Sequence, residues 1–424
     1  MERIVIIGGG FAGLNLVKKI DREKFEIILI DKNNFHSFPP LFYQIASSGL
    51  DPSNICFPLR REMRKERAKG ARFRMGEVKE IDTVKKTVTT QFETIHYDKL
   101  VIAAGCKNNF FGNDELIKYV YTLKSAAEAM RVRNVILDRL ERAALETDME
   151  VQRKMLSFVV VGGGPTGVEV AGAIGEMKRD ILPREYPTIN PENVNILLIE
   201  GSDRLLSAMS MESSLKAKKY LGKLMVDVKL NTMMDSYSQN VIHLKDGSEI
   251  FTSLLIWTAG ITAETFIFTN GNLQTAPGGR FPVDAYNRVI GQDDIFAIGD
   301  IAYMPSERYP RGLPQLAQVA IQQAKLLAKH INSGKFEKEF KYKDKGSMAT
   351  VGRNLAVADL PHLKVGGFIA WMMWMFVHLI SILGMRNKVT VLINWMWEYF
   401  TYNTSLRILL HSTRYPLRRR WGEF

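Results

Sequence analysis

The sequence predicts an α/β protein with two dinucleotide-binding domains in tandem, followed by an apolar C-terminal region. The order strand, glycine-rich loop, helix and strand ending in an acidic residue occurs twice, within residues 3–31 and 158–200. A length of 424 residues exceeds what one hydrophobic core supports and fits two or three modules. We therefore expect more than one domain, and Rossmann-like units in at least two of them.

Composition narrows the class of protein. Hydrophobic residues make up 46% of the chain and charged residues 24%, which excludes a disordered, collagen-like or disulfide-rich chain. The net charge of +12 suggests a polyanionic partner, either nucleic acid or an anionic lipid surface. The two cysteines, Cys56 and Cys106, form neither a CxxC redox pair nor a zinc cluster, so we expect a reducing compartment and no metal site.

The first unit consists of a strand at Arg3–Ile7, the loop GGGFAG at residues 8–13, a helix at Leu14–Ile20 and a strand at Ile27–Ile30. In such a loop Gly8 makes the tight turn, Gly10 lets a pyrophosphate approach the backbone, and Gly13 lets the helix pack on the strand. The positive end of the helix dipole then faces the phosphates. Asp31, at the end of the second strand, is placed to accept hydrogen bonds from the ribose hydroxyls.

The second unit consists of a strand at Phe158–Val161, the loop GGGPTG at residues 162–167, a helix from Val168 and a strand at Val194–Ile199. Glu200 follows that strand, and its carboxylate favours a free ribose 2′-hydroxyl over a 2′-phosphate, so we expect NADH rather than NADPH. Arg204 lies close enough in sequence to weaken this preference. We interpret the polar stretch Lys178–Asn193 as a surface excursion.

Three further strands end in small residues: Leu100–Gly105, Trp257–Gly260 and Ile295–Asp300. In the two-dinucleotide-binding-domain flavoprotein fold, such ends let the chain cross close to a cofactor, and a Gly-Asp pair meets the ribitol and pyrophosphate of FAD. The alternative for Asp300 is an ordinary turn acid. The order of segments predicts an FAD-binding domain at 1–111 and 263–336, an inserted NADH-binding domain at 112–262, and a C-terminal membrane-anchoring region at 337–424.

Three segments carry a resemblance to a known family: NFHSFPPLFYQIA at residues 34–46, TGVE at residues 166–169, and AQVAIQ at residues 317–322. The chain resembles, over essentially its whole length, the type II NADH dehydrogenases, which are non-proton-pumping NADH:quinone oxidoreductases of bacteria. The last segment fits the family's AQxAxQ quinone-site pattern. Sulfide:quinone oxidoreductases of the same fold need a late cysteine, and none follows Cys106. His36 is interpreted as structural.

The resemblance implies that Glu169, Gln318 and Gln322 are catalytic. Gln318 and Gln322 are four residues apart on a helix and share a face, as Ala317 and Ala320 do. The alternative is a helix start that packs alanine on the sheet and leaves the glutamines in solvent. Glu169 is expected near the flavin with a raised pKa, although Thr166-x-x-Glu169 also fits a capping box that satisfies helix amides.

The residues expected to contact the cofactors fall into two sets. For FAD they are Gly8, Gly10, Phe11, Ala12, Gly13, Asp31, Lys32, Val78, Ala104, Gly105, Gly299, Asp300 and Ala317. For NADH they are Gly162, Gly164, Pro165, Thr166, Gly167, Glu200, Ala259 and Gly260.

The C-terminal region is the apolar part of the chain. Residues 365–385 contain no Asp, Glu, Lys or Arg and are long enough to span a bilayer. A second apolar stretch, Val389–Tyr402, is rich in Trp and Tyr, and arginines follow at positions 407, 414, 418, 419 and 420. Aromatics beside arginines favour a monotopic helix pair at an anionic lipid interface; a spanning helix and a buried dimer interface are the alternatives. Before it, Phe336–Asp344 is expected to be a charged connector, and Gly346–Asp359 a hairpin.

These expectations combine into one function. We expect NADH to pass hydride to FAD, and two electrons then to reach a membrane quinone without proton pumping. The protein is expected to be a homodimer that binds peripherally to the cytoplasmic side of a bacterial inner membrane. The chain runs from Met1 straight into a strand, so no signal peptide is expected. The alternatives are an NADH reductase of an iron-sulfur protein, and an NADH-responsive flavoprotein that binds nucleic acid rather than catalysing.

Overall fold

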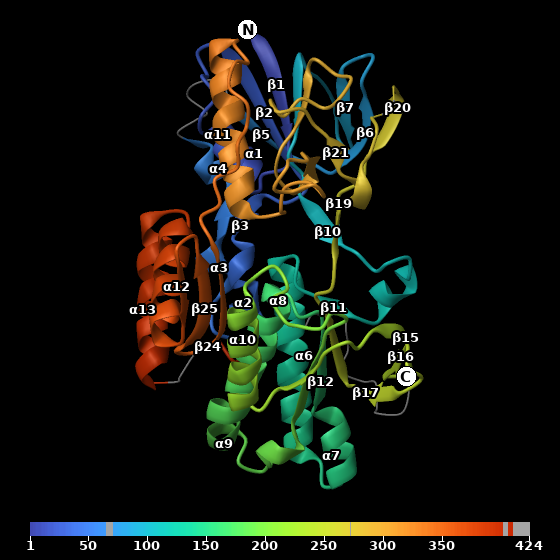
Figure 1. The fold of residues 1–424 in the computed structure, drawn as a ribbon, viewed down its shortest axis with the longest axis vertical. Coiled ribbons are helices and arrows are strands. Elements are labelled where there is room, and N and C mark those ends of the chain that lie inside the picture. The colour runs from blue at the N-terminus through green and yellow to red at the C-terminus, as the bar shows by residue number, and fades with distance from the viewer. Residues whose placement is uncertain (65–70, 272, 402–405, 410–424) are drawn as a thin grey trace. The chain divides into compact units, whose positions relative to one another are not determined.

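The computed structural model describes residues 1–64, 71–271, 273–401 and 406–409, and the chain forms two compact units (Figure 1). The first unit contains Met1–Ser37, Cys56–Lys107 and Ile261–Lys345. The second contains Phe38–Ile55, Asn108–Gly260 and the chain from Gly346 onward. Each unit therefore assembles from three separate stretches of sequence.

A five-stranded parallel sheet forms the centre of the first unit. Its strands, in spatial order, are β22 (Ile295–Ala297), β9 (Lys99–Ile102), β1 (Glu2–Ile7), β2 (Phe25–Asp31) and β5 (Ala71–Met75). The strands are continuous apolar runs because helices and a second sheet bury both faces. Helices α1 (Phe11–Val17) and α11 (Ala317–Ser333) pack side by side over it (Figure 1).

Smaller strands and turns complete the first unit. A second sheet has the order β20 (Ile267–Asn270), β6 (Val78–Asp82), β7 (Thr87–Thr90) and β8 (Thr94–His96). Two-stranded ladders join β3 (Phe35–Ser37) to β4 (Cys56–Pro58), β21 (Phe281–Pro282) to β23 (Ala302–Tyr303), and β10 (Cys106–Asn108) to β19 (Ile261–Ala263). The short helical turns are α4 (Leu59–Glu62), η5 (Pro277–Gly279) and η6 (Gly299–Ile301).

The second unit repeats the design. Its parallel sheet has the order β11 (Tyr121–Thr122), β18 (Leu254–Trp257), β12 (Ser157–Val161), β13 (Asn195–Ile199) and β14 (Asp227–Lys229). The long helices around it are α6 (Ala126–Leu145), α8 (Pro165–Glu176) and α10 (Met211–Lys223). The unit also contains a three-stranded sheet of β15 (Met234–Ser238), β16 (Val241–Leu244) and β17 (Glu249–Phe251). Its short helices are η1 (Pro39–Leu41), α2 (Phe42–Ala46), α3 (Pro52–Ile55), η2 (Asp114–Lys118) and α7 (Met149–Met155).

Both predicted βαβ units are present, with the helices starting earlier than expected. Helix α1 begins at Phe11 rather than Leu14, and α8 begins at Pro165 rather than Val168. In each case the third loop glycine, Gly10 or Gly164, is the N-cap, so the helix starts inside the glycine-rich motif. Proline suits the first helical position because it lacks an amide hydrogen that would have no partner there.

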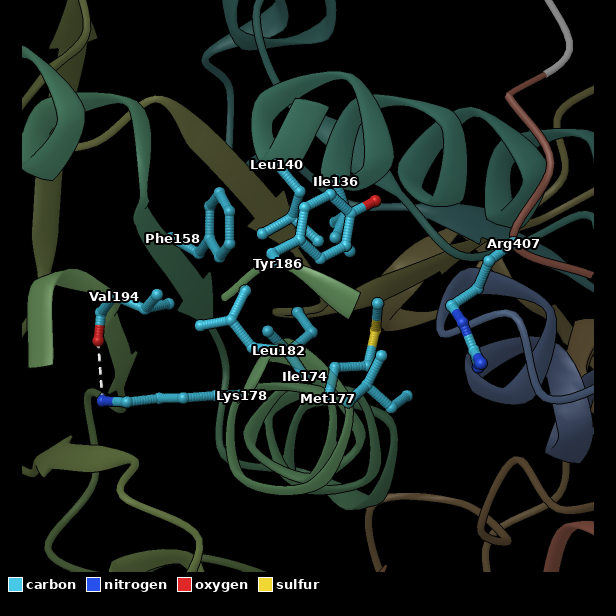
Figure 2. A pocket seen from close by; sticks show the side chains of 11 residues that line it. Ile136, Leu140, Phe158, Ile174, Met177, Lys178, Leu182, Tyr186, Val194 and Arg407 are labelled. Atoms are coloured by element: carbon cyan, nitrogen blue, oxygen red, sulfur yellow. Dashed lines mark hydrogen bonds between the residues drawn. The ribbon is translucent and has the colours of Figure 1, made fainter. Parts of the chain in front are cut away.

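The stretch Lys178–Asn193 is not the surface excursion that its polarity suggests. Helix α8 continues through a π-helical turn, η3 (Met177–Ile181), into α9 (Leu182–Glu185), and the turn η4 (Pro191–Asn193) follows. Leu182 and Tyr186 are buried and line an apolar cavity against α6 and β12, where Lys178 donates a hydrogen bond of 2.7 Å to the Val194 carbonyl (Figure 2). Apolar side chains at helical spacing among polar ones explain the error.

The C-terminal region begins with the predicted hairpin, which gains a third strand. Strands β24 (Ser347–Gly352), β25 (Leu355–Leu360) and β26 (Leu363–Gly366) form an antiparallel sheet, followed by helices α12 (Phe368–Ser381) and α13 (Met385–Thr401) (Figure 1). Gly367, with φ of 74°, separates β26 from α12 and shortens the apolar stretch that forms helix. Among the described residues, none of the helices has the length and hydropathy needed to cross a membrane. Arg414, Arg418, Arg419 and Arg420 lie outside the described residues.

Helices α12 and α13 bury only a narrow face. Trp374 and Trp395 are their large buried side chains and pack against each other. The opposite faces carry exposed apolar side chains: Phe368, Ile369, Met372, Phe376, Val377 and Ile380 on α12, and Val389, Leu392, Ile393, Met396, Trp397 and Phe400 on α13. We call this set the apolar face; patches of this kind are typical of docking surfaces rather than of ordinary protein surface.

Candidate functional site

The first glycine-rich loop has no room for side chains where the backbone segments meet. Gly8 has φ of 103°, and a Cβ there would lie 2.4 Å from the Ala103 carbonyl oxygen. A Cβ on Gly13 would lie 1.9 Å from the Gly8 carbonyl oxygen, so α1 packs on the loop backbone. A Cβ on Gly10, in contrast, would meet nothing within 4 Å. The loop therefore leaves its outer side open at Gly10, where a pyrophosphate is expected to approach.

Asp31 lies at the carboxyl end of β2, directly beside this loop. Its carboxylate accepts the Gly9 amide at 2.6 Å and the Asn33 amide at 2.7 Å. Burial raises the pKa of the Asp31 carboxyl, and the two amides partly offset that rise. The carboxylate is thus fixed in position and has lone pairs left for ribose hydroxyls.

The end of β22 meets the same loop through Gly299. A Cβ on Gly299 would lie 3.3 Å from the Ala12 Cβ, and the Gly299 amide donates to Gln323 of α11 at 2.8 Å. Next to it, the Asp300 carboxylate accepts a hydrogen bond of 3.1 Å from the Cys106 thiol. The first loop, the Gly-Asp strand end and the start of α11 therefore converge within the first unit. Ala104 and Gly105 follow β9 at the same sheet edge.

The second loop has the same steric design. Gly162 has φ of 109°, and its Cβ would lie 2.8 Å from the Ala259 nitrogen. A Cβ on Gly167 would lie 1.8 Å from the Gly162 carbonyl oxygen, whereas one on Gly164 would meet nothing within 4 Å. Pro165 and Thr166 open α8, and Gly260, with φ of 75°, follows Ala259 at the end of β18.

Glu200 occupies the position that corresponds to Asp31. It accepts the Gly163 amide at 2.5 Å and the Ser202 amide at 2.8 Å. Arg204, which could have favoured a 2′-phosphate, instead donates to the Ser207 carbonyl at 2.7 Å. The local geometry thus presents a carboxylate where a dinucleotide ribose is expected.

Glu169 lies on α8 within the second unit and is 8% exposed. Burial raises the pKa of its carboxyl well above the ordinary value, and a hydrogen bond from the Thr350 amide lowers it in part. The capping-box alternative does not hold, because Gly164 caps α8 without a side-chain hydrogen bond. The carboxyl therefore has no capping role, and burial shifts its equilibrium toward the protonated form.

The two glutamines of α11 bind the backbone of the connector that follows. Gln322 donates to the Lys343 carbonyl at 2.9 Å and accepts the Lys343 amide at 3.0 Å. Gln318 accepts the Lys345 amide at 3.1 Å. Both amides therefore have structural partners in the first unit, and their quinone-binding role stays a prediction. Ala317 is the first residue of α11.

The other predicted FAD-binding residues, and His36, contact neighbouring side chains and backbone of the first unit. The Lys32 amine lies 3.6 Å from the Glu264 carboxylate, and Val78 packs against the core of the first unit from β6. Phe11 stands edge-on to His36, with ring centroids 5.3 Å apart. His36 is buried with its Nδ1 at 2.8 Å from the Gly9 carbonyl oxygen, and burial lowers the pKa of its ring. That geometry agrees with a structural histidine.

Sequence reasoning missed a polar cavity in the second unit. Its chemically active walls are Tyr43, Gln44, Glu169, Glu176, Arg353 and Glu398, which come from four distant parts of the chain. Only the spacing of Glu169 and Glu176, seven residues and about two helical turns, could have linked any of them in advance. No short motif joins the others.

Known proteins agree with this architecture. The chain matches the family described as pyridine nucleotide-disulphide oxidoreductase over residues 2–324, and the NDH2 C-terminal domain over residues 345–401. It is 36% identical to the type II NADH:quinone oxidoreductase NdhA of Mycobacterium tuberculosis over 93% of this chain and 86% of that protein, and 34% identical to Ndh of the same organism over 93% and 87%.

Among solved structures, the NDH2 of Plasmodium falciparum in complex with NADH has the same fold. The TM-score is 0.88 with 24% identity, covering 97% of this chain and 100% of that one. The chain has two glycine-rich loops of one design, each with an acidic residue beside it. Its matches span both the nucleotide-binding region and the C-terminal domain. The chain therefore belongs to the type II NADH:quinone oxidoreductase family.

Proposed function

We propose that this protein oxidises NADH through a bound FAD and reduces a quinone with the two electrons, without proton pumping. The observation that carries the proposal is the pair of glycine-rich loops, each with an anchored carboxylate, in a member of this family. The overall reaction is NADH + quinone + H⁺ → NAD⁺ + quinol, so each turnover consumes one proton from water.

The first unit fits FAD. The open side of Gly10 accommodates the pyrophosphate, Asp31 accepts the ribose hydroxyls, and Asp300 at the Gly299 strand end lies where a ribitol or pyrophosphate is expected. When bound, FAD accepts hydride from NADH and returns an electron pair to the quinone. The other proposed FAD contacts are Gly8, Phe11, Ala12, Gly13, Lys32, Val78, Ala104, Gly105 and Ala317.

The second loop, 162–167, fits NADH. Gly164 leaves the phosphate side open, and the Glu200 carboxylate accepts the ribose hydroxyls while repelling a 2′-phosphate. Ala259 and Gly260 end the neighbouring strand β18 and give the dinucleotide a surface without bulky side chains. These contacts position the donor and exclude the phosphorylated analogue.

Glu169 is proposed as the residue that supplies a proton to the quinone oxygen. Its carboxyl is buried, and burial raises its pKa well above the ordinary value, which favours the protonated form that a general acid requires. Gln318 and Gln322 are proposed to shape the quinone site through α11. Since their amides bind residues 343 and 345, they would do so partly by fixing the connector.

The apolar face of α12 and α13 is proposed to dock on an anionic membrane, where the quinone resides. It carries the exposed Trp397, and the cations Arg386 and Lys388 lie near the start of α13. We place the protein peripherally on the cytoplasmic side of a bacterial inner membrane, as a homodimer. In this assignment residues 1–111 and 263–336 bind FAD, 112–262 bind NADH, and 337–424 anchor the protein.

One experiment tests the function. The purified protein in detergent is mixed anaerobically with NADH and then with a quinone analogue while the flavin absorbance is followed. Bleaching by NADH and recovery on quinone addition are expected. Bleaching without recovery would indicate another acceptor such as an iron-sulfur protein, and no bleaching would leave only a binding role.

A further inference from the structure

The polar cavity in the second unit is lined in part by Glu169. It has about 90 Å³ of space that water can occupy, and it is partly open to solvent. Three carboxyl groups line it: Glu169 and Glu176 from α8 and Glu398 from α13. With polar walls and this volume, the cavity meets the conditions under which proteins hold internal water.

Two glutamates share the cavity face of α8. Glu169 and Glu176 are seven residues apart, so they lie on the same side of the helix, about 10 Å apart along its axis. Ala173, between them, is small and leaves the space open. The opposite side of the helix is different: Ile174 and Met177 face the separate apolar cavity (Figure 2).

Arg353 holds both the Glu176 carboxylate and the end of α13. Its amide donates to the Glu176 carboxylate at 2.5 Å, while its guanidinium donates to the backbone carbonyls of Glu398 at 2.8 Å and Tyr399 at 3.1 Å. The guanidinium therefore holds the end of α13, and the Glu176 carboxylate accepts the Arg353 backbone amide.

Tyr43 lies among all three carboxyl groups. Burial raises the pKa of its phenol well above the ordinary value, and the charges of Glu169, Glu176 and Glu398 raise it further. The phenol oxygen accepts a hydrogen bond of 2.8 Å from Gln44, which in turn accepts from Trp395 at 2.9 Å. A phenol that stays protonated can accept a proton on one side while it gives one on the other.

The three carboxyl groups of the cavity differ in exposure. Glu169 is 8% exposed, whereas Glu176 and Glu398 are half-buried. Burial raises the pKa of Glu176 and of Glu398 to about 7 each, and the charge of Glu176 adds to the rise at Glu398. A group with a pKa near 7 can take a proton from water and pass it to a buried acid at a small free-energy cost for each transfer.

We propose that Glu176, assisted by Glu398, is the proton-entry residue that returns a proton to Glu169 through the cavity and the Tyr43 hydroxyl. The inference rests on the proposed function, because the reaction consumes one proton per quinol formed. Glu169 gives its proton to a quinone oxygen, and one proton taken from water at Glu176 replaces it. Charge and atoms balance with water as the source.

The groups around Glu176 set its titration. They are Tyr43 from α2, Arg353 from the turn after β24, Glu398 from α13, Arg407 beyond α13, and Arg179 and Asp180 from η3. The Arg353 amide and the charges of Arg353 and Arg179 lower the pKa of Glu176, and Asp180 raises it. The burial of Glu176 outweighs them. The charges of Arg353 and Arg407 lower the pKa of Glu398.

The test separates the two half-reactions in Glu176→Gln. Flavin bleaching by NADH is expected at the wild-type rate, and recovery with quinone is expected to slow about tenfold or more, within the range of general acid–base effects. Small weak acids such as formate or azide should restore the recovery rate, because they deliver protons into the cavity. Glu398→Gln should show a smaller loss. Glu212→Gln, at an exposed site on α10, is the matched control.

A second readout does not depend on turnover. Difference infrared spectra of the FAD-loaded protein between about pH 5 and about pH 9 should contain a protonated-carboxyl band that titrates near pH 7 and is lost in Glu176→Gln. Wild-type quinone turnover with unchanged recovery in Glu176→Gln would overturn the relay alone. Bleaching of the wild type without recovery would overturn the proposed function, and the relay with it.

Discussion

Glu200 holds its loop and is also the residue proposed to contact the dinucleotide ribose. Its carboxylate accepts the Gly163 and Ser202 amides, which hold the loop, and the same group faces the side on which a dinucleotide ribose is expected. A neutral amide at this position keeps an oxygen acceptor but removes the charge that repels a 2′-phosphate.

Glu200→Gln is therefore expected to relax the choice of donor. The ratio of kcat/KM for NADPH to that for NADH should rise about tenfold, mainly through KM, which corresponds to about 1.4 kcal/mol. Steady-state kinetics with both donors measure it. Asp203→Asn, three residues away and exposed, should leave the ratio unchanged. An equal loss with both donors would show that Glu200 only holds the loop.

The carboxyl pair Glu176 and Glu398 predicts how stability depends on pH. The pKa of each is about 7 in the folded protein against an ordinary 4.5, so protonation favours folding. Their contribution is complete below about pH 4.5 and is lost as pH rises through about 7. The Tm should therefore fall between about pH 5 and about pH 8, and Glu176→Gln with Glu398→Gln should flatten that fall. A wild-type slope retained in the double variant would contradict the assignment.

At this scale the geometry of the loop residues could be predicted from sequence, whereas Glu169 was the only cavity residue that the sequence singled out as a site residue. Gly8, Gly13 and Asp31 act within one local motif whose spacing carries its chemistry. Glu176 and Glu398 become partners only because α8 and α13, more than 200 residues apart, line the same cavity. Their raised pKa values come from burial, which no local pattern encodes.

At the scale of elements, α8 depends on a glycine in its interior. A Cβ on Gly172 would lie 1.8 Å from the Val351 carbonyl oxygen, so the backbone of β24 packs directly on the helix and helps to form the wall of the cavity. Helical glycine otherwise costs stability relative to alanine. Its presence here is explained by the close approach.

Gly172→Ala is expected to destabilise the protein by about 1–3 kcal/mol, the usual cost of overpacking. Urea unfolding of the FAD-loaded protein measures the change. Gly222→Ala in α10 is the matched control, because its Cβ would meet nothing within 4 Å and the change should be neutral or stabilising by about 0.5–1 kcal/mol. Equal effects at both sites would refute the packing argument.

Two side chains of helix α11 hold the backbone of the segment around residues 343–345. Gln322 makes a paired hydrogen bond with the backbone of Lys343, and Gln318 binds Lys345. Any effect of these glutamines on quinone reduction therefore includes an effect on residues 343–345.

Gln318→Ala with Gln322→Ala should slow quinone-dependent reoxidation while reduction by NADH stays nearly intact. The same variant should be cleaved faster by trypsin at Lys343 and Lys345, because each lost backbone clamp removes about 0.5–1.5 kcal/mol. Stopped-flow kinetics and timed digestion measure the two effects. Lys329→Ala, exposed on the same helix, is the control. Equal loss of both half-reactions would count against a quinone role.

Element types were predictable where periodicity was strong, and helix starts were not. The strands β1 and β12 and the hairpin β24–β25 lie where apolar patterning places them. Helices α1 and α8 begin three residues earlier than predicted, since a glycine N-cap lets a helix start within the motif. The C-terminal apolar stretch divides at Gly367, whose positive φ no hydropathy pattern reports.

At the scale of the whole molecule, the apolar face is the feature with no partner within the described chain. Phe376 and Trp397 are 64% and 62% exposed, which is unusual for side chains of this size. Each large aromatic transferred from water to an apolar environment contributes about 1.5–3 kcal/mol. A surface of this kind gains stability when a lipid layer covers it.

Phe376→Glu with Trp397→Glu should reduce sedimentation with vesicles of anionic lipid by at least tenfold. Bleaching of the flavin by NADH should be unaffected, because both side chains are exposed and far in sequence from the dinucleotide loops. Leu145→Glu with Met211→Glu, exposed apolar residues outside this face, forms the control pair. Retained vesicle binding would contradict membrane docking through α12 and α13.

The division of each unit into three stretches has a consequence for biogenesis. Strands β1, β2 and β5 emerge early from the ribosome, but β22, Gly299 and Asp300 of the same unit follow only after the inserted stretch Asn108–Gly260. The early strands must wait for a partner that is translated much later. Chaperone demand should therefore be greatest while residues 108–260 are being synthesised, and cofactor insertion should follow translation of residue 300.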